Sequence, residues 1–273
     1  SVPVGKQIYL FGRGIEDPVA REVERIGDTL NVKDGPGRFA SKANLDLEPI
    51  LDVLGDADEA NQRRLIAGFV NGVKTVLAEP PRSKAGDWTY EQTAGRVMPN
   101  LEVDTYLLGV KAAGMEEPWH VRFSDDLLLV ITIELDRGYR PLTQAQVDAW
   151  GATSDRVYSA ARSMLFHKTR DVRLRKDEPS PGVHMVKLGD GHDAARSIVL
   201  TEVFFSELDE GTFRFGTPNQ DMLYYVQSLD EETLEALASA TREAYEASDY
   251  PLSSALFELQ PTRPATAKAL TSQ

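Results

Sequence analysis

The sequence predicts an α+β fold, in which amphipathic helices pack on a mixed or antiparallel sheet. Three observations predict it. Segments with helical periodicity and segments with strand-like alternation both occur, but not in the steady βαβ order of a doubly wound parallel sheet. One apolar run, residues 126–135, suits a central strand. No linker rich in Pro, Gly or Ser divides the 273 residues cleanly.

We expect three parts along the chain. Residues 1–86 would form an N-terminal unit of hairpin and helix, and residues 87–259 the main α+β unit packed on it. Residues 260–273 lack periodicity, which predicts a disordered tail.

The N-terminal unit carries two clear patterns. Gly27 and Asp28 form a turn signal between two alternating segments, so we expect a hairpin with strands at 22–26 and 29–33. Residues 58–77 form an amphipathic helix, because the following apolar residues fall at helical spacing: Leu65, Ile66, Phe69, Val70, Val73, Val76 and Leu77.

Within the main unit, the apolar run 126–135 predicts a strand buried on both faces. Thr143 and Gln146 then form a capping box for a short helix that ends at Gly151. A second helix is expected from about Ser154. Its apolar face consists of Val157, Ala160, Ala161, Met164 and Leu165.

The C-terminal third mixes strands and one long helix. Residues 212–228 favour two strands broken at Pro218 and Asn219. Asp230 is placed to cap a helix that follows. The basic stretch 170–176 is typical of an exposed edge strand protected by charge.

Two segments of the chain share a pattern of identical residues. Residues 32–40, "VKDGPGRFA", and 186–194, "VKLGDGHDA", match at Val, Lys, Gly, Gly and Ala without a gap. This match is either a coincidence or the sign of two weakly related strand-turn-helix units, which would then superpose over 29–54 and 183–208.

Composition excludes several functions. The net charge of −13 repels phosphate, so we expect no nucleic-acid partner and no anionic membrane partner. The absence of cysteine excludes disulfides, thiolate chemistry and Cys-ligated metals. No apolar stretch approaches the roughly 18 residues of a membrane span, and no signal-peptide pattern opens the chain, so we expect a cytoplasmic protein.

The best chemical lead is "KLGDGHDAAR", residues 187–196, where His192 lies between two aspartates. The spacing of His184, Asp190, His192 and Asp193 is wrong for metal ligands on one helix face, which leaves only a strand-plus-loop site open, and the two glycines permit a turn. We therefore interpret this stretch as a turn and helix start, with Asp193 as the N-cap and His192 partly exposed, and we expect no metal and no cofactor. The candidate catalytic residues are Asp190, His192, Asp193 and Asp221, and the candidate ligand-binding residues are Arg196 and Asn219.

Residues 87–259 resemble the YtpQ-like family of uncharacterised bacterial proteins. The resemblance rests on four stretches: 97–107 ("VMPNLEVDTYL"), 123–165, 189–200 ("GDGHDAARSIVL") and 216–228 ("GTPNQDMLYYVQS"). His192 stands where an aromatic residue is expected, and Gln220 where arginine is expected. The resemblance implies one α+β unit in a bacterial cytoplasmic protein, and it implies no mechanism.

Three functions follow as hypotheses. The first is a non-catalytic protein that binds or regulates a protein partner; Trp119 in "EEPWHVRF" would lie either in a contact surface or, as we favour, in a strand entering the core. The alternative is a hydrolase-like enzyme that uses carboxylates and His192, with or without a divalent metal. A third is an anion-binding module in which Arg196 lies at a helix start, opposed by the neighbouring aspartates. Whether the protein is an enzyme stays open.

Overall fold

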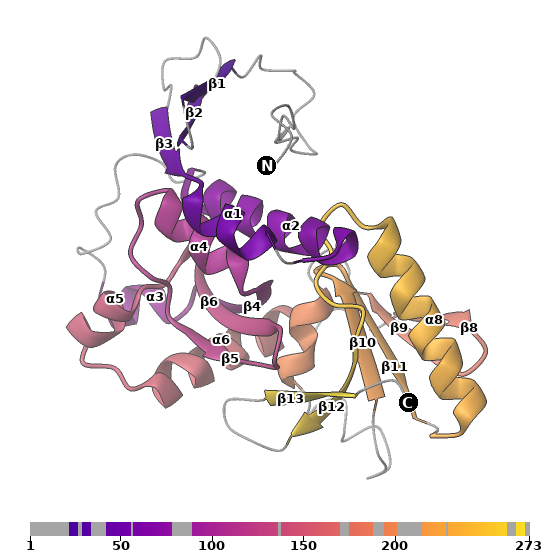
Figure 1. Ribbon diagram of the computed structural model, residues 1–273. Coiled ribbons are helices and arrows are strands. Elements are labelled where there is room, and N and C mark those ends of the chain that lie inside the picture. Colours follow the sequence, from indigo (N-terminus) through magenta and orange to yellow (C-terminus); the bar gives the residue numbers. More distant parts are fainter. Residues whose placement is uncertain are drawn as a thin grey trace.

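The computed structural model describes residues 22–26, 29–33, 42–55, 57–77, 89–135, 138–169, 175–187, 194–200, 214–227, 229–260 and 266–270 (Figure 1). Helices and antiparallel sheets share the described chain, which confirms the α+β class. Within these residues, no helix is both long and apolar enough to cross a membrane.

A three-stranded sheet contains β1 (Glu22–Ile26), β2 (Thr29–Lys33) and β3 (Lys42–Asp46), in that order. β1 and β2 pair antiparallel, with Ile26 opposite Thr29. The predicted hairpin is therefore confirmed at its predicted bounds.

A four-stranded antiparallel sheet lies at the centre of the main unit. β6 (Leu127–Leu135) pairs with β4 (Val97–Val103) on one side, and with β5 (His120–Arg122) and β7 (Gly138–Pro141) on the other. Leu129 on β6 is 0% exposed. The predicted central strand, buried on both faces, is confirmed.

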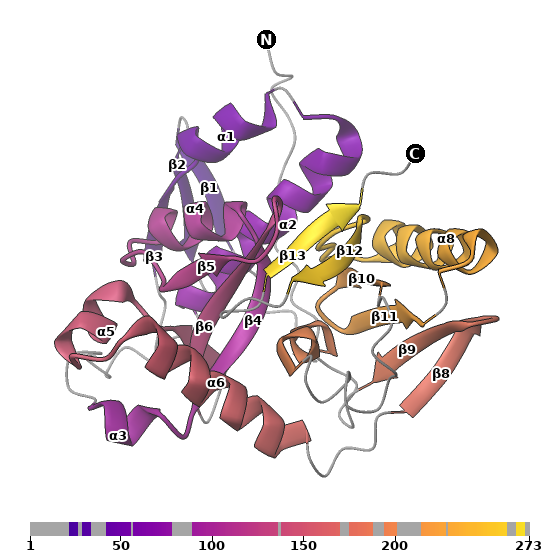
Figure 2. The ribbon, with the colours of Figure 1, turned by 90° about the horizontal axis from the view of Figure 1, so that it is seen from below.

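The six-stranded antiparallel sheet has the order β13-β12-β10-β11-β9-β8. Its strands are β8 (Arg175–Ser180), β9 (Val183–Lys187), β10 (Arg214–Asn219), β11 (Met222–Val226), β12 (Leu256–Gln260) and β13 (Thr266–Leu270). Helix α8 (Glu231–Ala247) packs on β10 and β11 (Figure 2). One hydrophobic core joins this sheet to the four-stranded one, because Phe215 and Phe257 belong to the same buried cluster as Leu129.

Seven further helices lie among the described residues. They are α1 (Glu48–Leu54), α2 (Glu59–Leu77), α3 (Tyr90–Thr93), α4 (Thr105–Ala112), α5 (Gln144–Ala149), α6 (Ser154–Thr169) and the 3₁₀ helix η2 (Ala194–Leu200). α6 packs on β4 from the side of the main core, and α2 packs on α4, β4 and β7.

Helices α2 and α4 meet through glycines. A Cβ on Gly109 would lie 2.0 Å from the Phe69 carbonyl oxygen, and one on Gly72 would lie 2.2 Å from the Tyr106 carbonyl oxygen. Both neighbours are backbone atoms, so no side chain could move aside to make room. The two backbones can approach this closely only because both positions are glycine.

The predicted helix ends are confirmed. Thr143 and Gln146 form the capping box of α5, and Gly151 follows that helix with φ +58°. The side chain of Asp230 accepts a hydrogen bond from the Thr233 amide at 2.8 Å. At the other end of α8, the Arg63 guanidinium of α2 donates to the Glu246 carbonyl at 2.7 Å and to the Ser248 carbonyl.

Three predictions are wrong in part. Residues 266–270 form β13, paired with β12, where a disordered tail was predicted; the pairing supplies the order that the short segment cannot supply alone. The two proposed repeat units differ, because 42–46 is a strand and the matching 196–200 is 3₁₀ helix. The chain turns at Gln220 and Asp221, two residues later than predicted, with a bulge that accommodates Pro218 in β10.

Other predictions fall partly on residues outside the description. β8 is an edge strand, as predicted for the basic stretch, but residues 170–174 are not described. The turn at 188–193 and the capping role of Asp193 also lie outside the described residues.

Candidate functional site

The candidate site centres on Glu102, a carboxyl inside the molecule. Every residue of β4 is buried, and Glu102 is 2% exposed. It stands opposite Leu128 of β6, and its neighbours on β4 are Leu101 and Val103. A carboxyl in such apolar surroundings needs hydrogen-bonding partners, because burial of an unpaired polar group costs several kcal/mol.

Two amides, from distant parts of the chain, supply those partners. The Asn71 side chain on α2 donates its Nδ2 to Glu102 Oε2 at 2.8 Å. The Gln220 side chain, in the turn between β10 and β11, donates its Nε2 to Glu102 Oε1 at 3.0 Å. Glu102 thus joins the four-stranded sheet to a helix on one side and to the tip of the six-stranded sheet on the other.

Burial raises the pKa of Glu102 from its ordinary value of 4.5 to about 8, and the hydrogen bonds from Asn71 and Gln220 offset part of that rise. Desolvation dominates because the two amides carry no net charge. At neutral pH most of the Glu102 carboxyl groups are therefore protonated.

Two phenols, the buried Tyr106 and the partly buried Tyr139, lie close enough to sense the charge of Glu102. Burial and the Glu102 carboxylate raise the pKa of Tyr106 on α4 well above 10, and they raise the pKa of Tyr139 on β7 to about 12. The Thr75 side chain on α2 offsets part of both rises, and Arg196 on η2 lowers the pKa of Tyr139 slightly. Both phenols therefore stay neutral throughout the physiological range and act as polar, uncharged neighbours.

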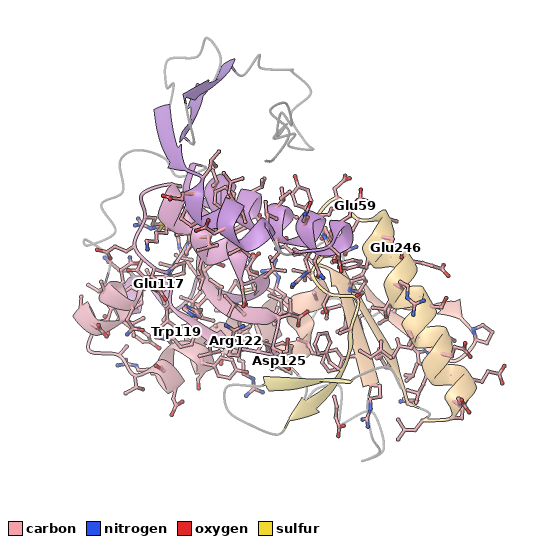
Figure 3. All side chains as sticks on the ribbon, in the orientation of Figure 1. Glu59, Glu117, Trp119, Arg122, Asp125 and Glu246 are labelled. Atoms are coloured by element: carbon pink, nitrogen blue, oxygen red, sulfur yellow. The ribbon has the colours of Figure 1, made fainter. Side chains whose placement is uncertain are left out.

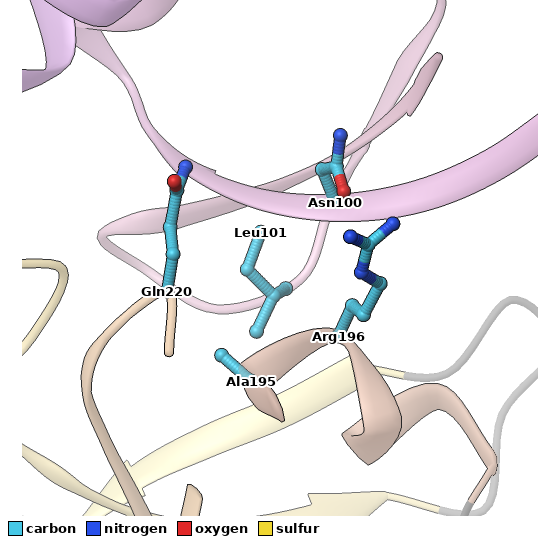
Figure 4. Close-up of a pocket in the computed structure, with 5 residues that line it drawn as sticks. All are labelled: Asn100, Leu101, Ala195, Arg196 and Gln220. Atoms are coloured by element: carbon cyan, nitrogen blue, oxygen red, sulfur yellow. The ribbon is translucent and has the colours of Figure 1, made fainter. Parts of the chain in front are cut away.

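A small recess shares one residue, Gln220, with the contacts of Glu102 (Figure 4). Its lining consists of Asn100, Leu101, Ala195, Arg196 and Gln220, and its volume is about 10 Å³, which is room for one water molecule. The Ala195 amide donates to the Gln220 carbonyl at 3.0 Å, so the turn and η2 are tied together at the edge of the recess. The arrangement can hold or exchange a proton, but a larger ligand would require the turn or η2 to move.

The structure brings together only some of the residues singled out from the sequence. Arg196 lines the recess, whereas Asn219 and Asp221 do not. Asp221 is exposed, and its amide donates to the Asn219 side-chain oxygen at 3.0 Å, which is a local turn contact. Asp190, His192 and Asp193 lie outside the described residues.

Glu102 itself was missed by the sequence reasoning. The available signal was a single carboxylate in the otherwise apolar stretch "VMPNLEV", where a buried strand would have to satisfy it. Gln220 was noted only as a departure from an expected arginine. Nothing local in the sequence indicates that these two residues meet, because 118 positions separate them.

Metal ligation has no support among the described residues, where no group of three or more His, Cys, Asp or Glu side chains could hold an ion. Trp119, labelled in Figure 3, is 3% exposed and belongs to the main core. The prediction that this tryptophan enters the core is confirmed, and its role in a contact surface is wrong.

A second feature lies at the surface, where α3 meets the start of α6. Tyr90 and Trp150 contact edge to face, with ring centroids 6.0 Å apart. The Arg156 guanidinium carbon lies 4.0 Å from the centroid of the Tyr90 ring. Both aromatic residues are partly exposed and Arg156 is exposed. We call these three residues the aromatic cluster.

Comparisons with known protein families, curated proteins and solved structures found no match for this chain. The resemblance to the YtpQ-like family therefore stays a prediction, and the arguments about function rest on the geometry of the two features just described.

Proposed function

We propose that this chain is a non-catalytic cytoplasmic protein that binds or regulates a protein partner, and that the aromatic cluster is its contact surface. The observation that carries the proposal is the meeting of Tyr90, Trp150 and Arg156 on one accessible surface. Trp, Tyr and Arg are the residue types that dominate the energetics of protein interfaces.

The backbone that carries Tyr90 and Arg156 is fixed by the capping hydrogen bonds of two helices. Tyr90 is the first residue of α3, whose start is fixed by the capping box of Thr89 and Gln92. Arg156 lies in the first turn of α6, and its amide donates to the Thr153 side chain. Preordered side chains lose little conformational entropy on binding, which favours affinity. The acidic net charge supports a protein partner over a nucleic acid or an anionic membrane.

Affinity capture with matched variants would test this proposal. Tyr90→Ala and Arg156→Ala are compared with the wild type and with Arg242→Ala, an exposed arginine on α8. We expect a protein that the wild type and Arg242→Ala capture equally, and that Tyr90→Ala and Arg156→Ala each capture at least about tenfold less. Equal capture by all four proteins would count against the aromatic cluster.

A hydrolase-like enzyme is the second candidate, and the raised pKa of Glu102 favours it. A carboxyl that is protonated near neutral pH can act as a general acid, and such shifts gather at catalytic sites. Arg196 beside the recess could then stabilise a developing negative charge. This proposal also gives a role to the candidate carboxylates near His192, which lie outside the described residues.

The enzyme candidate predicts hydrolysis that depends on Glu102. A panel of simple carboxylic and phosphoric esters is assayed with the wild type and with Glu102→Gln, whose folding is verified by circular dichroism. Activity that falls at least a hundredfold in the variant would support general-acid chemistry. Activity that is absent, or equal in the two proteins, would remove this candidate.

A further inference from the structure

We propose that the outer edge of β5 is a docking site for an extended, positively charged segment of a partner protein, which adds to the four-stranded sheet as a further strand. This edge is a second contact surface. It does not depend on the aromatic cluster or on the chemistry of Glu102.

The inner edge of β5 is paired with β6, and the ladder between the two strands shows which main-chain groups are used. The Ile131 amide donates to the Trp119 carbonyl at 3.4 Å, and the Phe123 amide donates to the Leu127 carbonyl at 3.0 Å. In an antiparallel pair, residues bonded in this way alternate with residues whose N–H and C=O groups point away from the partner strand. The main-chain groups of the even-numbered residues of β5 therefore face outward.

The outward residues are His120 and Arg122, which stand opposite Val130 and Leu128 of β6. In the described part of the chain β5 pairs with no other strand, and no described residue hydrogen-bonds to the main chain of His120 or Arg122. Their N–H donors and C=O acceptors are thus available to an added strand. Protein domains that bind extended peptides at a sheet edge gain affinity from such main-chain hydrogen bonds.

The other edges of this sheet are less suited to an added strand. β4 is buried along its whole length. On β7 the same alternation makes Tyr139 and Pro141 the outward residues, and proline has no N–H to donate. Of the described strands in this sheet, β5 therefore offers the outward row of donors and acceptors without a break.

Contacts on both faces of the sheet hold the β5 edge in place. On one face Trp119 and Phe123 are buried in the main core. On the opposite face the Arg122 guanidinium donates to both carboxylate oxygens of Asp104, at 2.9 and 2.8 Å, and to the Asp125 carbonyl at 3.0 Å. An edge that is already ordered loses little conformational entropy when a strand adds to it.

The charged residues around this edge are mostly acidic. Glu117 lies before β5 and Asp125 after it, and both are exposed, as is Glu116 (Figure 3). The guanidinium of Arg122 is already paired with Asp104. A segment with Lys or Arg at its ends is therefore attracted to the edge, and an acidic segment is repelled.

A second copy of this chain fits the edge less well. Two β5 strands that paired antiparallel about Val121 would place Glu117 of each copy opposite Asp125 of the other. Like charges directly opposite one another destabilise a strand pair. The occupant is therefore a different, basic segment, and a β-branched residue at its centre would lie beside Val121, which is partly buried against the main core.

A peptide titration, followed by NMR of the isotope-labelled full chain, tests the proposal. The probe is the acetylated peptide Lys-Lys-Thr-Val-Thr-Lys-Lys, and the control peptide has Glu in place of each Lys. The variant His120→Pro removes one outward N–H, which is a change that an edge strand accommodates. The matched variant His120→Ala removes the same side chain and keeps the N–H.

The docking site predicts that the basic peptide shifts the amide signals of His120 and Arg122, and that the acidic peptide binds at least about tenfold more weakly. His120→Pro should bind the basic peptide at least about tenfold more weakly than His120→Ala. Unchanged signals at these two amides, equal binding of the two peptides, or equal binding by the two variants overturns the proposal. A concentration-dependent shift of the same signals without peptide also overturns it, because that result assigns the edge to a second copy of the chain.

If His120→Pro does not fold, a basic peptide methylated at the main-chain nitrogens of both threonines decides instead. This peptide cannot donate hydrogen bonds to the outward carbonyls of β5. Binding that falls at least about tenfold on methylation supports the docking site, and binding that survives methylation overturns it.

Discussion

The Glu102→Gln variant should become more stable than the wild type as the pH rises. The reason is that the wild type must ionise a buried carboxyl, whereas the amide does not ionise. In the folded protein burial raises the pKa of Glu102 to about 8, whereas in the unfolded chain it lies near 4.5. The folded state therefore binds the proton more tightly. The stability that proton binding at Glu102 contributes is fully present below pH 4.5. It declines between pH 4.5 and about 8, and no further loss occurs above that pH.

The magnitude follows from the same two values. The rise in pKa from 4.5 to about 8 corresponds to a total loss of about 5 kcal/mol in the free energy of unfolding of the wild type. About 3 kcal/mol of that loss has occurred at pH 7. Exchanging an acceptor oxygen for an amide nitrogen costs about 1 kcal/mol in hydrogen bonding. We expect Glu102→Gln to exceed the wild type by about 2 kcal/mol at pH 7, and to be no more stable than the wild type at pH 4.

Urea unfolding at a series of pH values from 4 to 9 measures this difference, with Glu243→Gln as the exposed control. The free energies of unfolding of Glu102→Gln and the wild type should diverge as the pH rises, whereas the control should track the wild type. Parallel curves for Glu102→Gln and the wild type would refute the reasoning, because they would show that the buried carboxyl does not bind its proton more tightly in the folded state.

Four further outcomes are expected. Leu129→Asp should unfold the protein, since an unpaired charge in the core costs several kcal/mol, and a soluble, cooperatively melting variant would contradict that placement. Gly109→Ala should lose about 1–3 kcal/mol in chemical denaturation, whereas Gly95→Ala, with open space at its Cβ, should be neutral or slightly stabilising. Asp230→Ala should lower the free energy of unfolding by about 1 kcal/mol through loss of the α8 cap, and an unchanged value would argue against it. A chelator should leave the melting temperature unchanged, and a drop that disappears in His192→Ala would indicate a metal site.

The local structure of this chain follows from local signals. Helix α2, the Thr143 capping box and the Asp230 cap all depend on residues within a few positions of one another, and each was predictable from spacing and residue type. The β1–β2 hairpin belongs with them, because its turn fixes its register.

What could not be predicted depends on distant partners. Residues 42–46 and 196–200 occupy the same position in the shared sequence frame, yet the first is a strand because β2 pairs with it, and the second is 3₁₀ helix packed on β4 and β11. Tertiary contacts override a local pattern of this length. The candidate site follows the same logic: Arg196 could be named as a polar residue near a helix start, but only the folded chain brings Gln220 to Glu102.

The hydrogen bonds of Arg63 have a consequence for how the chain is made. A helix from the first third of the chain completes the end of α8 by binding carbonyls 183 and 185 positions later. During synthesis, α2 can pack on α4 as soon as both emerge from the ribosome, since they are close in sequence. The α8 terminus must wait for nearly the whole chain, so a nascent protein halted before residue 246 would carry a packed helix pair with one guanidinium still in water, and closure of this long loop would be among the last steps of folding.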